Sequence, residues 1–350
     1  MKARSAAIQG ALAAAGLVAA YVTWQRPPET QKKESVIIAD ANKNSLERVS
    51  YSDGTRVVTV EKKDRFYVTL AYLPGKRPEY DAGSPMDALD AGTLPDGGVL
   101  PKRPPPPPPV PDRTVYANER AEQLWTKLTP FEGTRALGAI STEKLSELGL
   151  EGSPRRLELT ISGAPTSFVI NKQVAGLAGS YAQNEKTKDV FLVSNQLFNE
   201  LDPNSTVLVD RRLHTFKLTE FDAFTVSSGG KTASYVASGA DIPATMRIAP
   251  AATPDKPDEL TKNWHDKIWS RLVVTEVLSK DEPPRNGAPE VVLRLEYTLK
   301  GKPVGWLELA NDEKQAWWAR SENTASWVAL HSGTQDIALE GAKLAQGTAP

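Results

Sequence analysis

Short segments of alternating apolar and polar residues follow one another along most of the chain. In 66–72 every second residue is apolar, which is the period of a strand with one buried face. Apolar and β-branched residues also gather in 46–51 and 57–60, on either side of Asp53 and Gly54. An Asp-Gly pair between two such segments is typical of a tight β-hairpin, so we expect an antiparallel sheet in this region.

A helical period replaces the alternation at two places whose sequences resemble each other. The segment 121–128 reads AEQLWTKL, with apolar residues at i, i+3, i+4 and i+7, and the segment 265–272 reads HDKIWSRL. Each predicts one amphipathic helix. We therefore expect an α+β fold built from two duplicated sheet-plus-helix modules, the first at 35–209 and the second at 210–350.

One stretch of the first module, 75–112, has neither period. It is rich in Pro, Gly, Asp and Ala and contains an uninterrupted proline run at 104–109. Because the second copy has no equivalent stretch, we expect a disordered surface insertion that the module does not need. The proline run is either a semi-rigid spacer or a docking ligand for an aromatic groove.

The N-terminal segment 1–24 contains the longest uncharged stretch. Lys2 and Arg4 precede it, and at about 1.5 Å per residue the stretch 6–24 can span a hydrocarbon layer of about 30 Å. We expect an N-terminal transmembrane anchor, a tether at 25–34, and a single-pass inner-membrane protein whose bulk is periplasmic or otherwise extracytoplasmic. The alternatives are a cleaved signal peptide and a buried helix of a soluble protein.

Composition excludes several classes of partner and chemistry. The formal net charge is −1 and no long basic stripe is present, so we expect no nucleic-acid partner. The chain has no cysteine, which excludes disulfides, thiolate metal sites and cysteine nucleophiles.

The remaining motifs do not combine into a catalytic or metal site. Gly230, Lys231 and Thr232 resemble the end of a phosphate-binding loop, but they align with the turn of the first hairpin and are expected to form a turn. His214, His265 and His331 fall in different predicted elements without ligand-type neighbours. We therefore expect no catalytic residue, no metal, no cofactor and no enzymatic activity.

Comparison of the two copies sorts the tryptophans into two groups. Four of them stand opposite large apolar residues of the first copy and are expected to lie in the core: Trp269, Trp306, Trp318 and Trp327, opposite Trp125, Phe168, Tyr181 and Val190. Trp264 and Trp317 have no aromatic counterpart, so the shared fold does not explain them. Because aromatic residues are frequent in interface hot spots, these two are candidate partner contacts.

A charged triplet, Asp210-Arg211-Arg212, lies at the predicted passage from the first copy to the second. We consider it a further candidate contact for a partner. The alternative is a salt-bridged connection between two domains.

Several short segments resemble a bacterial family known only as a domain of unknown function. They are WQRPP at 24–28, LGL and a proline within 148–154, SYA at 180–182 before DVFLV at 189–193, and VDRRL at 209–213. The resemblance covers most of the chain outside the proline-rich stretch, which departs from the family pattern. It implies membrane-anchored proteins encoded beside ABC exporter subunits of the gliding-motility type.

The resemblance and the missing catalytic motifs favour a non-enzymatic accessory subunit of an ABC-type export or cell-surface machine that acts outside the cytoplasm. Its partners would be ABC-type transporter subunits, with the N-terminal helix holding it at the membrane. Two other classes stay open, namely an envelope ligand-binding protein with its site between the modules, and an envelope hydrolase.

Overall fold

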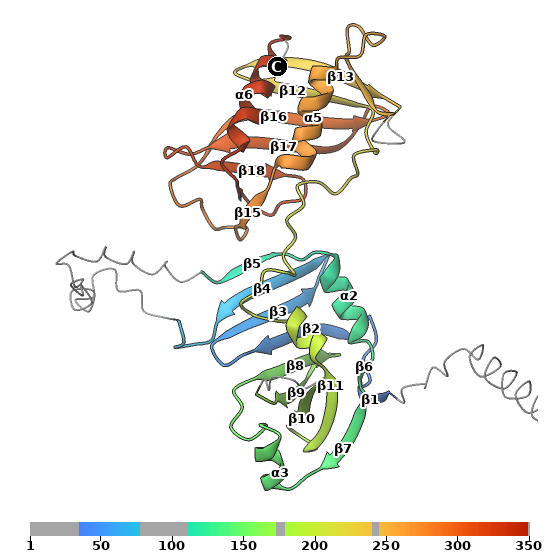
Figure 1. Cartoon of the computed structure of the whole chain (residues 1–350), viewed down its shortest axis with the longest axis vertical. Helices are drawn as coiled ribbons and strands as arrows, with labels where there is room; N and C mark the ends of the chain where they lie inside the picture. The colour runs from blue at the N-terminus through green and yellow to red at the C-terminus, as the bar shows by residue number, and fades with distance from the viewer. Residues whose placement is uncertain (1–34, 78–110, 173–178, 240–244, 349–350) are drawn as a thin grey trace, which may run out of the picture.

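The computed structural model describes residues 35–77, 111–172, 179–239 and 245–348, and the strands among them form three antiparallel sheets. The helices are few and short, so the protein is mainly β and the expected α+β class is wrong (Figure 1). The cause is the length of the apolar segments, which form strands of 3 to 10 residues instead of longer helices.

The first module contains a nine-stranded sheet in the order β5-β4-β3-β2-β8-β9-β10-β11-β7, and β1 pairs with β6 beside it. Its strands are β1 (Val36–Ala39), β2 (Leu46–Ser52), β3 (Arg56–Lys62), β4 (Phe66–Tyr72), β5 (Arg113–Tyr116), β6 (Phe131–Gly133), β7 (Arg135–Ala139), β8 (Arg156–Ile161), β9 (Ala164–Ile170), β10 (Gly179–Asn184) and β11 (Asp189–Ser194). Its helices are α2 (Glu119–Lys127), α3 (Thr142–Glu147) and α4 (Asn195–Glu200).

The second module contains an eight-stranded sheet in the order β14-β13-β12-β16-β17-β18-β19-β15. Its strands are β12 (Ala223–Ser228), β13 (Lys231–Ser238), β14 (Arg247–Pro250), β15 (Val274–Val277), β16 (Glu290–Leu299), β17 (Lys302–Asn311), β18 (Trp317–Ser321) and β19 (Val328–Leu330). Its helices are α5 (Glu259–Arg271) and α6 (Thr334–Ala345).

Both sheets have the same order of corresponding strands. From β4 to β7 the first sheet matches the second from β14 to β15, position by position, and β5 is the additional strand. The pairing agrees at the level of residues, since Val49 is opposite Leu159 and Phe224 is opposite Tyr297 in equivalent strands. Residues that differ between equivalent positions therefore identify what the shared fold does not require.

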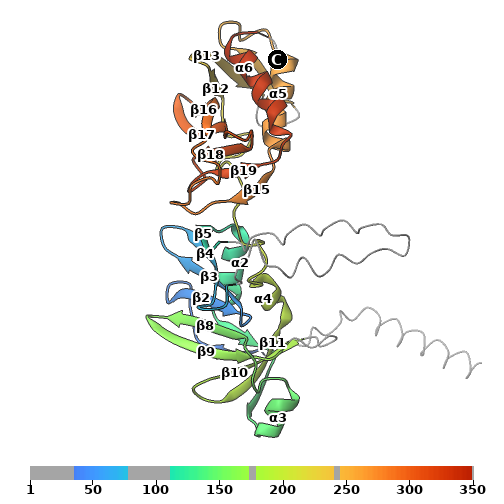
Figure 2. The ribbon, with the colours of Figure 1, turned by 90° about the vertical axis from the view of Figure 1, so that its left-hand side faces the viewer.

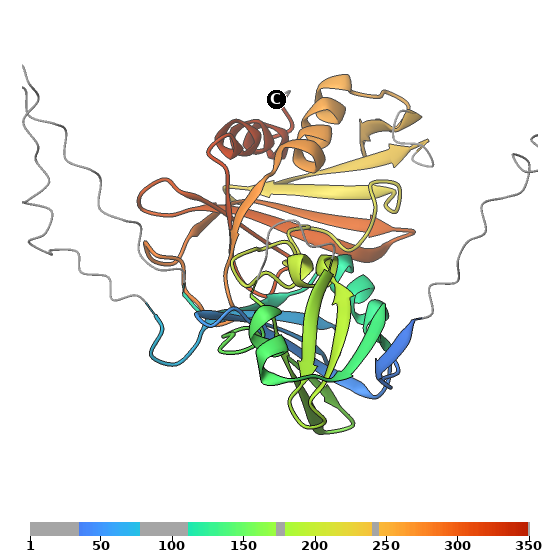
Figure 3. The ribbon, with the colours of Figure 1, turned by 60° about the horizontal axis from the view of Figure 1, so that its bottom comes forward.

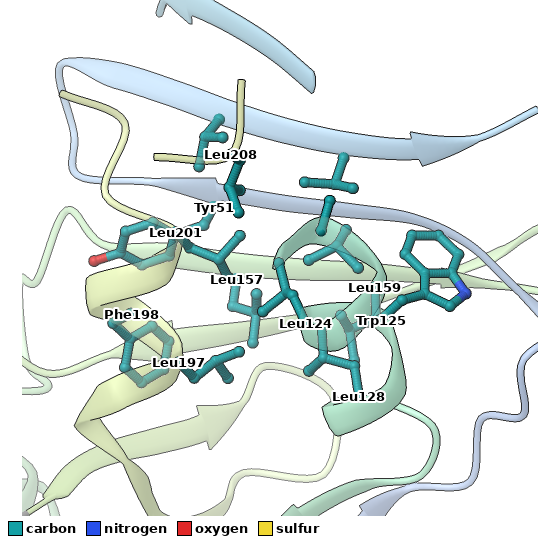
Figure 4. Packing of buried hydrophobic residues seen from close by; sticks show 14 of the residues in the cluster. Tyr51, Leu124, Trp125, Leu128, Leu157, Leu159, Leu197, Phe198, Leu201 and Leu208 are labelled. Carbon is teal, nitrogen blue, oxygen red and sulfur yellow. The ribbon is translucent and has the colours of Figure 1, made fainter. Parts of the chain in front are cut away.

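Helices pack on one side of each sheet. In the first module, three side chains of α2 and its C-terminal cap point toward the strands, namely Leu124, Trp125 and Leu128 (Figure 4). They lie next to Phe198 of α4 and Leu201, which follows α4. In the second module α5 and α6 lie side by side on the sheet (Figure 3). Figure 2 shows α5 and α6 on the same side of the molecule as α2 and α4. No helix in the described part of the second module covers the opposite face of its sheet.

The predicted anchor at 1–24 and tether at 25–34 lie outside the described residues. Among the residues that are described, no helix is long and apolar enough to cross a membrane. The longest, α5, has 13 residues, or about 20 Å, against about 30 Å of hydrocarbon. This finding corrects the expectations of an N-terminal transmembrane helix and of a single-pass inner-membrane protein.

Candidate functional site at the module junction

The chain passes from the first module to the second through 201–222, which contains neither helix nor strand. Its middle part is attached to the end of β5, because Val209 forms a bridge with Ala117 and the Asp210 N–H donates to the Tyr116 carbonyl over 2.9 Å. The charged triplet therefore lies where β5 of one sheet faces β15 of the other (Figure 1).

Asp210 is the centre of this junction, and its side chain is only 1% exposed. Its Oδ1 accepts hydrogen bonds from the backbone N–H and the Nε of Arg212, both at 3.0 Å. Its Oδ2 accepts from Arg212 Nη2 at 2.9 Å and from Asn323 Nδ2 at 3.3 Å. Arg65 Nη2 of the first module lies 3.7 Å from the same oxygen, so one carboxylate binds both modules.

A second ion-pair cluster joins the two strands that face each other. Arg113 of β5, with a side chain 10% exposed, places Nη2 2.7 Å from a carboxylate oxygen of Glu276 and 2.7 Å from one of Glu282. Although burial opposes ionisation, hydrogen bonds from Arg113 and from the Ser279 N–H hold the pKa of Glu282 below its usual value. This arrangement fixes the two sheets relative to each other.

An open groove of about 620 Å³ lies beside Asp210 and is called the junction groove below. Its lining residues are Asn118, Glu119, Arg120, Thr206, Val207, Val209, Asp210, Arg211 and Arg212. Arg212 is neutralised by Asp210 and Glu119, and the hydrogen bond to Asp210 raises its pKa. Arg120 and Arg211 are exposed and form no ion pair with the described residues; Arg211 donates only to the Thr206 hydroxyl, at 2.8 Å. The groove thus offers two guanidinium groups to an anionic ligand or side chain.

The structure separates the five residues that the sequence proposed as partner contacts. Asp210, Arg211 and Arg212 meet at the junction, and Asp210 and Arg212 form the salt-bridged connection that was the alternative reading. Trp264 and Trp317 lie in the second module, 0% and 9% exposed, and the expectation that they form a contact surface is wrong.

A neighbouring helix explains Trp264. Its Nε1 donates to the Ile337 carbonyl of α6 over 2.8 Å, and a Cβ on Gly341 of α6 would lie 2.7 Å from its ring. The corresponding helix of the first module is α4, with only 6 residues. Trp264 therefore fills space against a helix that is longer in the second module, which is why the first copy has Arg120 at the matching position.

Sequence reasoning missed Arg65, Arg113 and Asn323, which complete the junction. Each is a single polar residue in a turn or short strand, and its partners lie far away along the chain. No local pattern distinguishes such residues from ordinary solvent-exposed ones.

His214 and His265 both lie against the rings of Trp269 and Tyr297, and His331 follows β19. His214 Nδ1 lies 3.2 Å from Glu322, His331 Nδ1 accepts a hydrogen bond from the Gly333 N–H, and His265 is completely buried. Burial lowers the pKa of His265 to about 3, so the ring is neutral near pH 7. Within the described ranges, no group of three or more His, Asp or Glu side chains is placed to hold a metal ion.

One comparison with known proteins gives a family. Residues 119–288 match the family described as a domain of unknown function, DUF4340. The matched region begins at α2 and ends before β16, so it contains all residues of the junction groove except Asn118, and Arg113 lies just before it. No curated protein matches the chain. The resemblance to an uncharacterised domain-of-unknown-function family is supported to this extent.

Proposed function

We propose that the protein is a non-enzymatic accessory subunit of an ABC-type export or cell-surface machine and acts through contact between its junction groove and another subunit. The observation that carries this proposal is the arrangement around Asp210. Contacts from Arg65, Arg212 and Asn323 hold two modules in one orientation, while Arg120 and Arg211 form no ion pair with the described residues at the open groove.

A rigid, partly charged groove suits a contact function. The ion pairs of Asp210 hold this part of the junction in place before a partner binds, and guanidinium groups with free donors recognise carboxylates with two parallel hydrogen bonds. The ABC-type partner is supported by the family resemblance of the sequence. The groove itself supports a complementary acidic surface on that partner.

The same groove favours one other function. A hollow of about 620 Å³ between the start of α2 and the connecting segment has the size of a small-molecule site, so an anionic ligand is the second candidate. Under that alternative, the isolated protein binds the ligand without any partner subunit.

Crosslinking in cells tests the contact function. The full-length protein is expected to crosslink to ABC-type subunits through residues around the groove, and the double charge reversal Arg120→Glu with Arg211→Glu is expected to remove the crosslinks. Arg135→Glu, an exposed arginine on β7 away from the junction, is the matched control and should keep them. Equal crosslinking by the groove variant and wild type, or crosslinks confined to other surfaces, contradicts the proposal.

A further inference from the structure

The face of the second sheet opposite α5 and α6 carries a row of charged and aromatic side chains across β16, β17, β18 and the residue before β19. Glu308 of β17 lies between two arginines: Arg294 Nη1 of β16 is 2.5 Å from one carboxylate oxygen, and Arg320 Nε of β18 donates to the other. The guanidinium carbon of Arg294 lies 5.3 Å from the ring centroid of Trp306, and that of Arg320 lies 4.7 Å from Trp327. We call these five residues the Trp-Arg row.

Strand pairing shows that the row lies on one face. Glu308 is directly opposite both Arg294 and Arg320 in the ladder, and directly opposite residues point to the same side of a sheet. The core residues Leu295, Leu307 and Ala319 alternate with them on the other side, under α5 and α6. Although no helix covers it, the Glu308 side chain is only 6% exposed, because the arginines and tryptophans of the row surround it.

Register places Trp306 in this row and not in the core. Leu157 pairs with Phe168 in the first module, and its equivalent Leu295 pairs with Leu307 in the second. Leu307 is thus the counterpart of Phe168, and the expectation that Trp306 takes this place is wrong by one residue. A shift of one residue moves a side chain to the other face of a strand.

The shared fold does not require the row. The positions equivalent to Trp306, Glu308 and Arg320 are Ser167, Val169 and Gln183, which follow from the same register. Only Arg294 keeps its residue type, as Arg156. A partly desolvated Arg–Glu–Arg triad contributes little to stability compared with apolar side chains of similar volume. The triad is present in one module and absent from the other, which indicates a role other than folding.

One arginine of the row has donors left over. Arg294 uses Nε and both Nη nitrogens on Glu296 and Glu308. Arg320 uses only Nε, on Glu308, and its side chain is 46% exposed, so its two Nη groups face solvent without an acceptor in the described part of the chain. The buried Glu308 holds this guanidinium in place, which prepares it for a carboxylate.

We propose that the Trp-Arg row is a docking surface for a protein segment that presents a carboxylate between apolar side chains. The carboxylate accepts the Nη groups of Arg320, and the flanking apolar side chains pack on the exposed parts of Trp306 and Trp327. Arg and Trp are the residue types most enriched in interface hot spots. The row shares no residue with the junction groove, so this surface is separate from the one proposed above.

Peptide binding to the full-length protein tests the proposal. The probes are two synthetic pentapeptides with blocked ends, Leu-Asp-Leu-Glu-Leu and its uncharged analogue Leu-Asn-Leu-Gln-Leu. Their binding is measured by tryptophan fluorescence and by calorimetry. The acidic peptide should bind at least about tenfold more tightly than the analogue, because the analogue cannot form the charge-assisted hydrogen bonds to Arg320. Arg320→Gln should remove that preference, and Arg320→Lys should retain part of it because the charge stays.

Arg156→Gln in the first module is the matched control and should leave the preference unchanged. Circular-dichroism melts report whether each variant folds, and Arg320→Lys keeps the test interpretable if Arg320→Gln unfolds. Equal affinity for both peptides, no binding of the acidic peptide at millimolar concentration, or an equal loss in Arg156→Gln would overturn the assignment.

Discussion

Asn323 donates a hydrogen bond of 3.3 Å from Nδ2 to the buried carboxylate of Asp210, across 113 residues of sequence. The same amide nitrogen donates to the Arg212 carbonyl over 2.9 Å. Its neighbour Glu322 accepts hydrogen bonds from the backbone N–H groups of Thr215 and Trp306. One turn after β18 therefore holds the connecting segment at two successive places.

Removing the carboxylate of Asp210 should weaken the junction. In Asp210→Ala, Asn323 loses a hydrogen-bond acceptor and the partly buried Arg65 loses an ion-pair partner, and we expect the free energy of unfolding to fall by about 1–3 kcal/mol. Urea unfolding followed by circular dichroism measures this change. Asp255→Ala, which removes an exposed carboxylate, should change it by less than about 0.5 kcal/mol. Equal effects of the two substitutions would show that the junction contributes nothing.

His265 should make the protein less stable in weak acid. Its pKa is lowered from 6.5 to about 3, so between these values the unfolded chain binds a proton that the folded protein does not. The contribution of the neutral His265 to the free energy of unfolding is fully present above pH 6.5 and is lost as the pH falls. Between pH 7 and pH 5 the free energy of unfolding should therefore decrease by about 2 kcal/mol.

Denaturation at both pH values, with wild type and His265→Leu, isolates this contribution from other titrating groups. The variant should lose about 2 kcal/mol less than wild type over the same interval. His331→Gln, which changes an exposed histidine, should behave as wild type does. An unchanged pH dependence in His265→Leu contradicts the argument.

Gly341 should resist the substitution that normally strengthens a helix. Alanine is favoured over glycine inside a helix by about 1 kcal/mol, but a Cβ here would lie 2.7 Å from side-chain atoms of Leu293 and of Trp264. We expect Gly341→Ala to destabilise the protein by about 1–3 kcal/mol through overpacking. Thermal melts should show a smaller loss when the same change is made in Trp264→Phe, where the ring leaves more room. A gain in melting temperature would rule out the tight packing.

Two tryptophans should respond differently to truncation. Trp125 is 2% exposed in the core of the first module, and Trp125→Ala should cost about 3–5 kcal/mol. Trp306 lies on the uncovered face with Arg294 over its ring, and Trp306→Ala should cost about 1 kcal/mol. Urea titrations measure the free energy of unfolding of both variants. An equal decrease in the two variants would show that Trp306 is a core residue.

Local patterns in the sequence predicted individual helices and strands better than they predicted the contacts between distant residues. The amphipathic period in 121–128 and the alternation in 66–72 correspond to α2 and β4, because both signals depend on neighbours in sequence. The balance between helix and sheet was misjudged, since strands outnumber the few short helices.

Features that depend on distant partners could not be predicted. The pairing of β16 with β17 has irregularities at Val291–Leu293 and Tyr297–Thr298, and such irregularities change which residues are opposite each other. A shift read from aligned sequences therefore placed Trp306 one position wrong. The burial of Trp264 depends in the same way on the length of α6, which is encoded more than 70 residues later.

The extra strand β5 has a consequence for solubility. Two sheets have four edge strands, and unpaired backbone groups on an edge can recruit strands from other chains. Here backbone groups of β5 are satisfied at the junction: the Thr114 N–H donates to the Ser279 hydroxyl, and the Tyr116 carbonyl accepts from the Asp210 N–H, while Arg113 of β5 pairs with Glu276 of β15. Each of these two sheets ends in one further edge strand away from the junction. One is the four-residue β14, which ends in Pro250, and the other is the irregularly paired β7. Both are poor templates for aggregation, so the junction protects the protein from uncontrolled sheet growth.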